Sequence, residues 1–492
     1  MNLTTSETES AGDAIRLRKS RKYEIALVVI FLLTLPLCNP WVRGDGVGYY
    51  AFARSMLIEH RLDFANDWLH ANESFRLGRT DAAGHINADQ YTPTGHLDNH
   101  FSVGPAILWS PFLILAHAGV VLYDHFGGKI AADGFSRPYL LAMALGTAVY
   151  GFLAVLISFS LARRFVPEKW AFLGALGIWF GSSLPVYMYF NPSWSHAQAA
   201  FAVALFLWYW VRTRGHRTWT QWVILGALGG LMMDAYYINA VLLLVPLCES
   251  AGLLWSVFKN NRPQTIRAFV LKNIAYCVAI FLAFLPTLIT KKIIYGSYLN
   301  FGYTEHWFWE SPAFFRVCFS SEHGLFSWTP ILALAVIGLV FLRKHDRTVA
   351  LYLLMGFVLY VYAIGCYQDW HGISSYGSRF FVALTAVFII GLAAFFDWFA
   401  GLWRERRTAV YAATATTAVL LLWNFGMIFQ WGMHWIPERG PVSWRLAAHN
   451  NVVAVPEQGA SILRTYFIRR STLMNRIEQR DIQQLKQSQG TK

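Results

Sequence analysis

The sequence predicts an all-α protein built as a polytopic bundle of transmembrane helices, and three observations support this fold class. The 492 residues are 55% hydrophobic and 16% aromatic, whereas only 14% are charged. Apolar runs of about 20 residues, the length that crosses ~30 Å of hydrocarbon as a helix, recur along the chain. Short basic clusters separate many of these runs. Such a chain cannot bury its apolar surface in one soluble core, so the bilayer must be its solvent.

The net charge of +13 does not indicate nucleic-acid binding. The lysines and arginines lie in clusters between apolar runs. The positive-inside rule predicts such clusters in the cytoplasmic loops of a membrane protein, so we expect a multi-pass protein of the inner (cytoplasmic) membrane. The five cysteines are scattered, with neither a CxxC pair nor the spacing of metal ligands. We therefore expect no nucleic-acid partner, no structural disulfide and no cofactor, and the sequence does not indicate a divalent metal.

The first expected span, 23–42, follows a basic N-terminal stretch, 1–22, which we place in the cytoplasm. No small-residue cleavage site follows this run, so we interpret it as an uncleaved helix rather than a signal peptide. The other expected spans are 137–162, 170–189, 194–212, 219–236, 237–258, 267–290, 326–343, 347–366, 378–402 and 408–430.

One further apolar run, 104–123, decides between eleven and twelve spans. Five basic clusters separate spans, at 163–169, 212–217, 259–272, 343–347 and 404–407. If these clusters and the N-terminus are cytoplasmic, only one helix can cross between the first outer loop and Arg163. The run contains a glycine and two prolines near its start, which favours an interfacial or re-entrant helix. We therefore expect eleven spans. Twelve spans are the alternative, and they would place the basic cluster at Arg163 outside.

The expected loops are strongly asymmetric. All cytoplasmic loops are short, so chemistry is expected on the extracytoplasmic side. The polar end of the chain, 483–492, is expected to be disordered. Within a transmembrane domain at 23–430, the outer segments are a first loop at 43–136, a second large loop at 291–325 and a short one at 367–377, and an outer tail follows at 431–492.

Asp45 is the first candidate catalytic residue. It follows the first span and lies among glycines, in Arg43-Gly44-Asp45-Gly46, at the outer boundary of the membrane. A carboxylate there is within reach of water, substrate and lipid headgroups, and the glycines allow the backbone to approach a bulky ligand. The alternative is that Asp45 only caps the next expected helix, 49–59.

These features together resemble the C-type (GT-C) superfamily of membrane glycosyltransferases. The features are Asp45, the long first loop with its interfacial helices, the second large loop and the segment Ser320-Ser321-Glu322-His323-Gly324-Leu325-Phe326-Ser327-Trp328-Thr329-Pro330. The chain is most similar to the bacterial branch, glycosyltransferase family 39-like, that is related to protein O-mannosyltransferases and to the aminoarabinose transferase of lipid A. The resemblance extends over about 23–430.

The resemblance implies an activity and its partners. The donor would be a polyprenyl-phosphate-linked sugar, and the sugar would be transferred outside the cytoplasm to an acceptor hydroxyl or phosphate. By position, Asp45 would be the first-loop acid that acts on the acceptor. An inverting transfer needs such a base and positive charge on the departing phosphate. The sugar and the acceptor stay open, and membrane lipids are the other expected partners.

The candidates for binding the donor phosphate are basic residues at the outer ends of spans. The enzymes of the family that the chain resembles often carry a lysine at the position of His100. The ordinary pKa of histidine is ~6.5, so the charge of His100 at neutral pH is an open question. Any one of these residues could instead extend to lipid headgroups. The candidates are His100, Arg137, Lys292, Arg316 and Arg379.

Further candidates for contact with the sugar or the acceptor lie at outer helix ends and in two loops. Tryptophan and tyrosine stack on sugar faces, although aromatic residues are also common at membrane interfaces. Pairs such as Glu322 with His323 offer too few ligands to indicate a metal site. The candidates are Tyr49, His196, Asp234, Glu322, His323, Trp370, His371 and Tyr376.

The alternative function is a transporter or flippase of lipid-linked glycans without catalysis. Such a protein would need ionisable residues in the middle of spans and, typically, internal repeats. Charge in the middle of spans is sparse here, and no repeat is evident.

Overall fold

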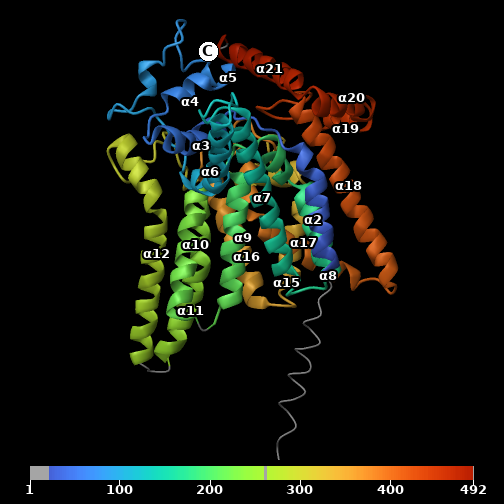
Figure 1. Ribbon diagram of the computed structural model, residues 1–492. Coiled ribbons are helices and arrows are strands. Elements are labelled where there is room, and N and C mark those ends of the chain that lie inside the picture. Colours follow the sequence, from blue (N-terminus) through green and yellow to red (C-terminus); the bar gives the residue numbers. More distant parts are fainter. Residues whose placement is uncertain (1–20, 216, 260–262, 491–492) are drawn as a thin grey trace, which may run out of the picture.

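The structure is a computed structural model that describes residues 21–215, 217–259 and 263–490. Figure 1 shows a bundle of long helices with a layer of shorter helices and loops across one end. Apart from three isolated β-bridges, the regular structure of the described residues is helical. The predicted all-α helix bundle is confirmed.

Seven helical segments of the described chain are long and apolar enough to cross a membrane by length and composition. The number of spans stays a prediction, because the other expected spans contain shorter or interrupted helices. The seven are Gly104–His125 (α6), Arg137–Ala162 (α7), Tyr237–Trp255 (η5 and part of α11), Ile266–Tyr295 (part of α12), Arg347–Cys366 (α16), Arg379–Ala400 (η6 and α17) and Arg406–Gly432 (α18).

The interruptions have a local cause in two places. Pro185 follows α8, and Pro330 precedes α15, and proline has no backbone N–H to donate to a helix. The shorter helices are α2 (Lys22–Thr34) with η1 (Leu35–Leu37), α8 (Glu168–Gly181) with η4 (Val186–Phe190), α9 (His196–Thr213), α10 (Trp219–Ala235) and α15 (Ile331–Leu342).

The two ends of the bundle differ in the way the sequence predicts. At one end, which we call the basic end, Arg163 forms an ion pair of 2.7 Å with Glu24 near the start of α2, and Arg214 pairs with Asp346. Arg163 therefore lies where the eleven-span interpretation requires it. The opposite end, which we call the loop-rich end, carries 38–136, 296–330, 367–378 and 433–490 (Figure 1).

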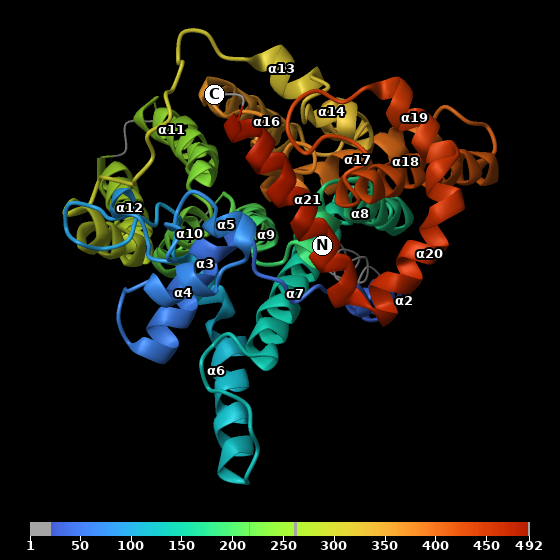
Figure 2. The same cartoon turned by 90° about the horizontal axis from the view of Figure 1, so that it is seen from above.

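The helix α6 lies in the layer at the loop-rich end. Seen from above, it runs outward from the bundle, steeply inclined to the long helices (Figure 2). Apolar side chains are exposed along it: Leu115 of α6 and Phe126, the residue after its end, are 73% and 79% exposed. This orientation is the one expected of the interfacial helix.

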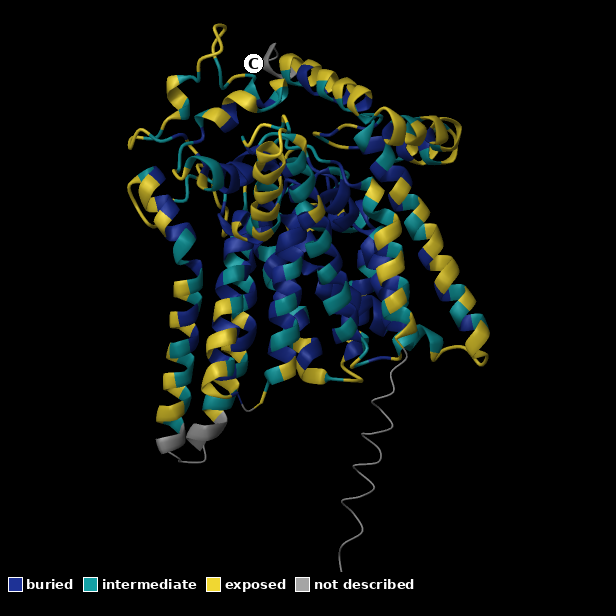
Figure 3. Cartoon of the chain, viewed as in Figure 1, coloured by how far each residue is buried: buried dark blue, intermediate teal, exposed yellow. Residues whose placement is uncertain are grey.

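The outward faces of the bundle are apolar. Leu33 of α2, Phe281 of α12 and Leu422 of α18 are 74%, 55% and 71% exposed, respectively. Figure 3 shows exposed residues along the outer helices around a buried interior. Exposed apolar surface on this scale needs lipid as its solvent, so the chain is a multi-pass membrane protein.

The C-terminal tail is more ordered than predicted. It forms three helices, α19 (Trp444–Val452), α20 (Ala454–Ile468) and α21 (Arg470–Gly490), so disorder from residue 483 was wrong up to Gly490, and 491–492 lie outside the described residues. The physical reason is packing. Leu473, Ile477 and Ile482 of α21 are buried, and Glu478 accepts hydrogen bonds from the first loop.

Candidate active site

Asp45 begins the helix α3 (Asp45–Arg54) at the loop-rich end. Gly44 adopts a left-handed φ of 53°, which favours glycine. A Cβ on Gly46 would lie 1.9 Å from the Ser193 hydroxyl oxygen. These glycines let α3 pack closely against 193–194, and this packing fixes the carboxylate in place. Gly44 also lines the cavity described below, so the predicted approach of a ligand to this backbone stays a prediction.

The structure pairs Asp45 with Arg379, although 334 positions separate them in the chain. Arg379 Nη1 lies 2.6 Å from Asp45 Oδ2, and the side chains are 12% and 32% exposed. The guanidinium also stacks 4.6 Å from the centre of the Trp194 ring. Trp194 in turn donates a hydrogen bond of 3.0 Å to the Arg43 carbonyl. Trp194 thus connects the Arg379 side chain to the backbone just before Asp45.

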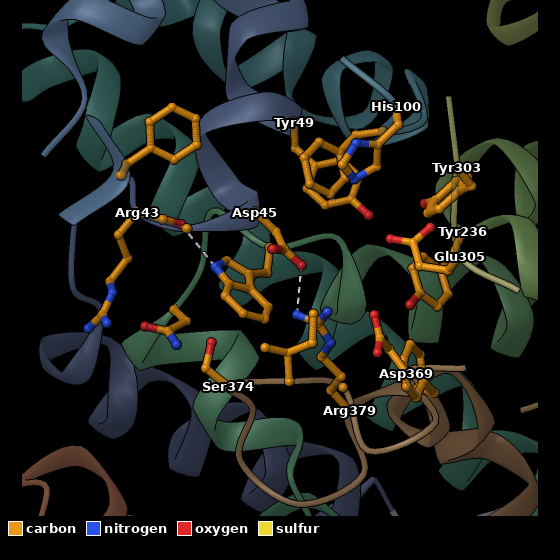
Figure 4. Close-up of a pocket in the computed structure, with 18 of the residues that line it drawn as sticks. Arg43, Asp45, Tyr49, His100, Tyr236, Tyr303, Glu305, Asp369, Ser374 and Arg379 are labelled. Atoms are coloured by element: carbon orange, nitrogen blue, oxygen red, sulfur yellow. Dashed lines mark hydrogen bonds and ion pairs between the residues drawn. The ribbon is translucent and has the colours of Figure 1, made fainter. Parts of the chain in front are cut away.

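Asp45 and Arg379 face a cavity of about 1180 Å³ at the loop-rich end (Figure 4). Aromatic side chains line much of it, and carboxylates and arginines share the remainder. The size and the mixed lining suit a ligand with an apolar ring face and an anionic group. Among the lining residues are Tyr49, Tyr236, Tyr303, Trp307, Tyr367, Asp98, Glu305, Asp369, Glu438, Asp481, Arg43, Arg79 and Arg439.

Arg79 is a cavity residue that the sequence analysis missed. Its guanidinium lies over the Phe75 ring and donates a hydrogen bond of 2.8 Å to the Phe75 carbonyl. None of the described carboxylates forms an ion pair with it, whereas Arg43 pairs with Asp481. Arg79 is a cation in a predicted outer loop, so it breaks the positive-inside pattern in the same way as Lys292. That signal would have found it.

Two other predicted residues line the cavity. The Tyr49 ring packs 4.5 Å from the Phe101 ring. The His100 ring lies 4.9 Å from the Tyr303 ring, tilted by 59°, and burial lowers the pKa of His100. Burial thus favours the neutral imidazole. It can donate a hydrogen bond to a phosphate but supplies no positive charge.

Three predicted phosphate ligands lie outside the cavity, and the structure gives them other environments. Arg137 is exposed at the start of α7, and Arg316 is exposed on α13 (Phe314–Phe319). Lys292 is exposed and donates a hydrogen bond of 2.7 Å to the Gly296 carbonyl. Its neighbour Lys291 points inward and binds the carbonyls of 99 and 101. Lys291 therefore supports the loop that carries His100.

Two of the predicted sugar or acceptor ligands are buried behind the cavity, where their role is structural support. His196 packs edge-on against Tyr187 and Tyr236, with ring centres 4.6 and 5.2 Å apart. Tyr376 is fully buried and hydrogen-bonds Asn424 Oδ1 at 2.8 Å.

Asp234 is buried as well, at 1% exposure, and Thr287 of α12 lies beside its carboxylate.

The loop at 367–377 and the segment at 322–323 pack on each other beside the cavity. His323 Nδ1 hydrogen-bonds the His371 carbonyl at 2.7 Å, and burial lowers the pKa of His323 to about 4. Glu322 Oε1 lies 3.8 Å from His371 Nδ1, and the Trp370 ring packs against His371. These predicted residues support the loop, while Asp369 from the same loop lines the cavity.

A cluster of His434, Glu438 and Asp481 is the one place in the described chain where three groups of metal-ligand type meet, with ligand atoms within 4.8 Å. His434 Nε2 lies 2.8 Å from Asp481 Oδ1 and 3.1 Å from Glu438 Oε1. Burial disfavours the charged imidazole, but hydrogen bonds to Asp481 and Glu438 outweigh it and raise the pKa of His434 to about 9. With Arg43 also on Asp481, the charges are balanced without a metal. The expected absence of a metal stays a prediction.

No protein-family model matches the chain, and no curated protein matches it. The chain is similar to the crystal structure of ArnT from Cupriavidus metallidurans bound to undecaprenyl phosphate, at 13% identity and a TM-score of 0.47, over 84% of this chain and 72% of that one. It is also similar to the archaeal oligosaccharyltransferase AglB from Archaeoglobus fulgidus, in complex with an inhibitory peptide and a dolichol-phosphate. Here the identity is 15% and the TM-score 0.45, over 88% of this chain and 54% of that one.

Proposed function

We propose that this membrane protein is a glycosyltransferase that moves a sugar from a polyprenyl-phosphate donor to an acceptor hydroxyl or phosphate. The observation that carries the proposal is the Asp45 carboxylate, paired with Arg379 at 2.6 Å and open to a cavity of about 1180 Å³ at the loop-rich end. A single positioned carboxylate beside fixed cations is the minimum set for an inverting transfer from a lipid phosphate.

In the proposed step, Asp45 is the general base. Arg379 binds one carboxylate oxygen, Oδ2, so Oδ1 is left to accept the proton of the acceptor hydroxyl. The acceptor oxygen forms a bond to the anomeric carbon as the bond from that carbon to the phosphate oxygen breaks. The electron pair leaves with the polyprenyl phosphate, and attack from the opposite face inverts the anomeric configuration.

The departing phosphate needs positive charge that acids do not already neutralise. Arg79 lines the cavity without an ion pair among the described residues, so we assign it to the phosphate. Arg379 is already paired with Asp45, but it can add hydrogen bonds to the phosphate, because a guanidinium has five N–H donors and Asp45 occupies only part of them. The aromatic side chains Tyr236, Tyr303 and Trp307 offer faces on which a sugar ring can stack.

The proposed location is the inner membrane, with the loop-rich end and its cavity on the extracytoplasmic side. The basic clusters around Arg163 and Arg214 lie at the opposite end, which is where the positive-inside rule puts cytoplasmic loops. The N-terminal stretch before α2 would then be cytoplasmic.

The test uses purified protein in proteoliposomes with a panel of polyprenyl-phosphate sugars, and it follows consumption of the donor. We expect turnover with at least one donor, and the Asp45→Asn variant should lose more than about 10²-fold in kcat because the amide cannot accept the proton. Asp81→Asn is the matched control, since Asp81 is an exposed acid of the same loop. Full activity of Asp45→Asn would refute the base assignment. If the wild type turned over no donor but moved lipid-linked sugars between leaflets, the flippase alternative would replace the proposal.

A further inference from the structure

The helix α20 carries an apolar stripe that no part of the described chain covers. Pro456, Ala460, Leu463 and Phe467 are exposed and follow the spacing of one helix face. Leu463 and Phe467 are 48% and 51% exposed. The adjacent face, with Gly459 and Tyr466, packs on the protein, where the Tyr466 hydroxyl donates a hydrogen bond of 2.6 Å to the Leu37 carbonyl.

The position of α20 along the bundle axis follows from the helices that it joins. Figure 2 shows α20 on the rim of the bundle, running from α18 toward α2. At one end, Gly459 of α20 packs near Phe429 of α18, only a few residues beyond the exposed Leu422. At the other end, the Tyr466 hydroxyl binds the carbonyl of Leu37, four residues beyond Leu33, which is 74% exposed. Leu422 and Leu33 face the hydrocarbon, so α20 lies directly above the acyl chains, at headgroup level.

The charge of the same segment points to the kind of surface that it meets. Three exposed arginines, Arg445, Arg464 and Arg469, lie in α19, in α20 and just after it. Glu457 is the only acidic residue of 444–469. An amphipathic helix with cations beside its apolar stripe binds a membrane surface, and its cations favour anionic headgroups.

We infer that α19 and α20 form an interfacial anchor, in which Leu463 and Phe467 enter the leaflet at the loop-rich end and the arginines bind anionic lipid headgroups. The anchor also accounts for arginines that the positive-inside rule would not place in an outer tail. The helix α21 continues directly from α20, crosses the loop-rich end and places Asp481 on the cavity wall (Figure 2). The anchor therefore holds one wall of the cavity at the membrane surface. The inference rests on the membrane bundle and not on the proposed enzymatic activity.

The test is spin-label accessibility in the full-length protein, reconstituted in vesicles that contain phosphatidylglycerol. In a background with all native cysteines replaced by alanine, one label is placed at Leu463→Cys and a matched control at Gln458→Cys, on the polar face. We expect the ratio of collisions with oxygen to collisions with a polar nickel reagent to be several-fold higher at 463 than at 458, on the order of the contrast between lipid and water.

Two further experiments distinguish lipid from other partners that could cover the apolar stripe of α20. Replacing phosphatidylglycerol with phosphatidylcholine, or the three arginines with glutamine, should lower the ratio at 463 toward that at 458. Equal ratios at 463 and 458 in the wild-type background would overturn the anchor. A label at 463 that becomes mobile and water-accessible when the protein is diluted in lipid would show instead that a second copy of the chain covers the stripe.

Discussion

At the residue scale, the sequence predicted Asp45, the proposed base, but not the whole set of cations around it. Asp45 was predicted from its position after the first span, and Arg379 from its position at the outer end of a later span. Arg79 was missed, although it lines the same cavity. Three of the predicted cations lie elsewhere, because the topology decides which end of a span a side chain occupies but not the direction in which it points. Lys291 and Lys292 are adjacent, yet only Lys291 points inward.

Substitution of Arg79 tests the phosphate assignment at this scale. Arg79→Gln removes a cavity arginine that forms no ion pair with the described carboxylates, so the donor should bind more weakly while the proposed base stays in place. We expect the KM for the donor to rise about tenfold, equivalent to about 1.4 kcal/mol, and kcat to change less. Arg61→Gln is the matched control, because the Arg61 side chain is 62% exposed. Unchanged kinetics of Arg79→Gln would remove Arg79 from the phosphate site.

At the element scale, long apolar runs were enough to predict helices, whereas polar helices were not visible in the sequence. The run at 347–366 became α16 with the same bounds. In contrast, α21 has few apolar residues and depends on partners far away in the chain. Asn72 of the first loop hydrogen-bonds Glu478 at 2.7 Å, and Arg43 binds Asp481 at 2.7 Å. Such contacts between distant segments have no local signature, so 483–492 was expected to be disordered.

The attachment of α21 should depend on pH through His434. Its pKa is raised to about 9 in the folded protein, above the ordinary value of ~6.5. The stabilisation from the charged imidazole is therefore complete below about pH 6.5 and is lost as the pH rises through about 9. The groups that face His434 are Glu438 and Asp481, with Arg43 on the far side of Asp481.

We measure the ratio of the rate of trypsin cleavage after the exposed Arg476 to the rate after the exposed loop site Arg61. We expect this ratio to be several-fold higher at pH 9.5 than at pH 7. In the His434→Gln variant this ratio should be high at both pH values, and α21 should be less stable by about 1–3 kcal/mol. Cleavage at Arg61 corrects for the pH dependence of the protease. A ratio independent of pH in the wild type would exclude His434 as the group that holds α21.

At the scale of the whole molecule, charge placement predicted which segments share an end, and ion pairs between distant segments agree with it. Arg163 meets Glu24, and Arg217 meets Glu249 at 2.8 Å. Thr92 of the first loop hydrogen-bonds the Ile294 carbonyl at the opposite end of the bundle. Charge placement and hydropathy did not determine the number of spans, since 104–123 has the length and the hydropathy of a span. Its inclined orientation depends on packing that hydropathy does not encode.

Reagent accessibility distinguishes eleven spans from twelve and tests the orientation at the same time. With an N-terminus in the cytoplasm, both topologies place Ala83→Cys outside, but they disagree on every loop after residue 123. Eleven spans place Arg164→Cys and Gly401→Cys inside, whereas twelve place both outside, because one extra crossing inverts all later loops. In a cysteine-free background, we expect a membrane-impermeant maleimide to label only Ala83→Cys in right-side-out vesicles, and the other two only after permeabilisation. Labelling of both Arg164→Cys and Gly401→Cys in intact vesicles would make α6 a span. Labelling of these two but not of Ala83→Cys would show instead that the whole bundle is inverted, with the cavity in the cytoplasm, where the proposed base could not meet an extracytoplasmic donor.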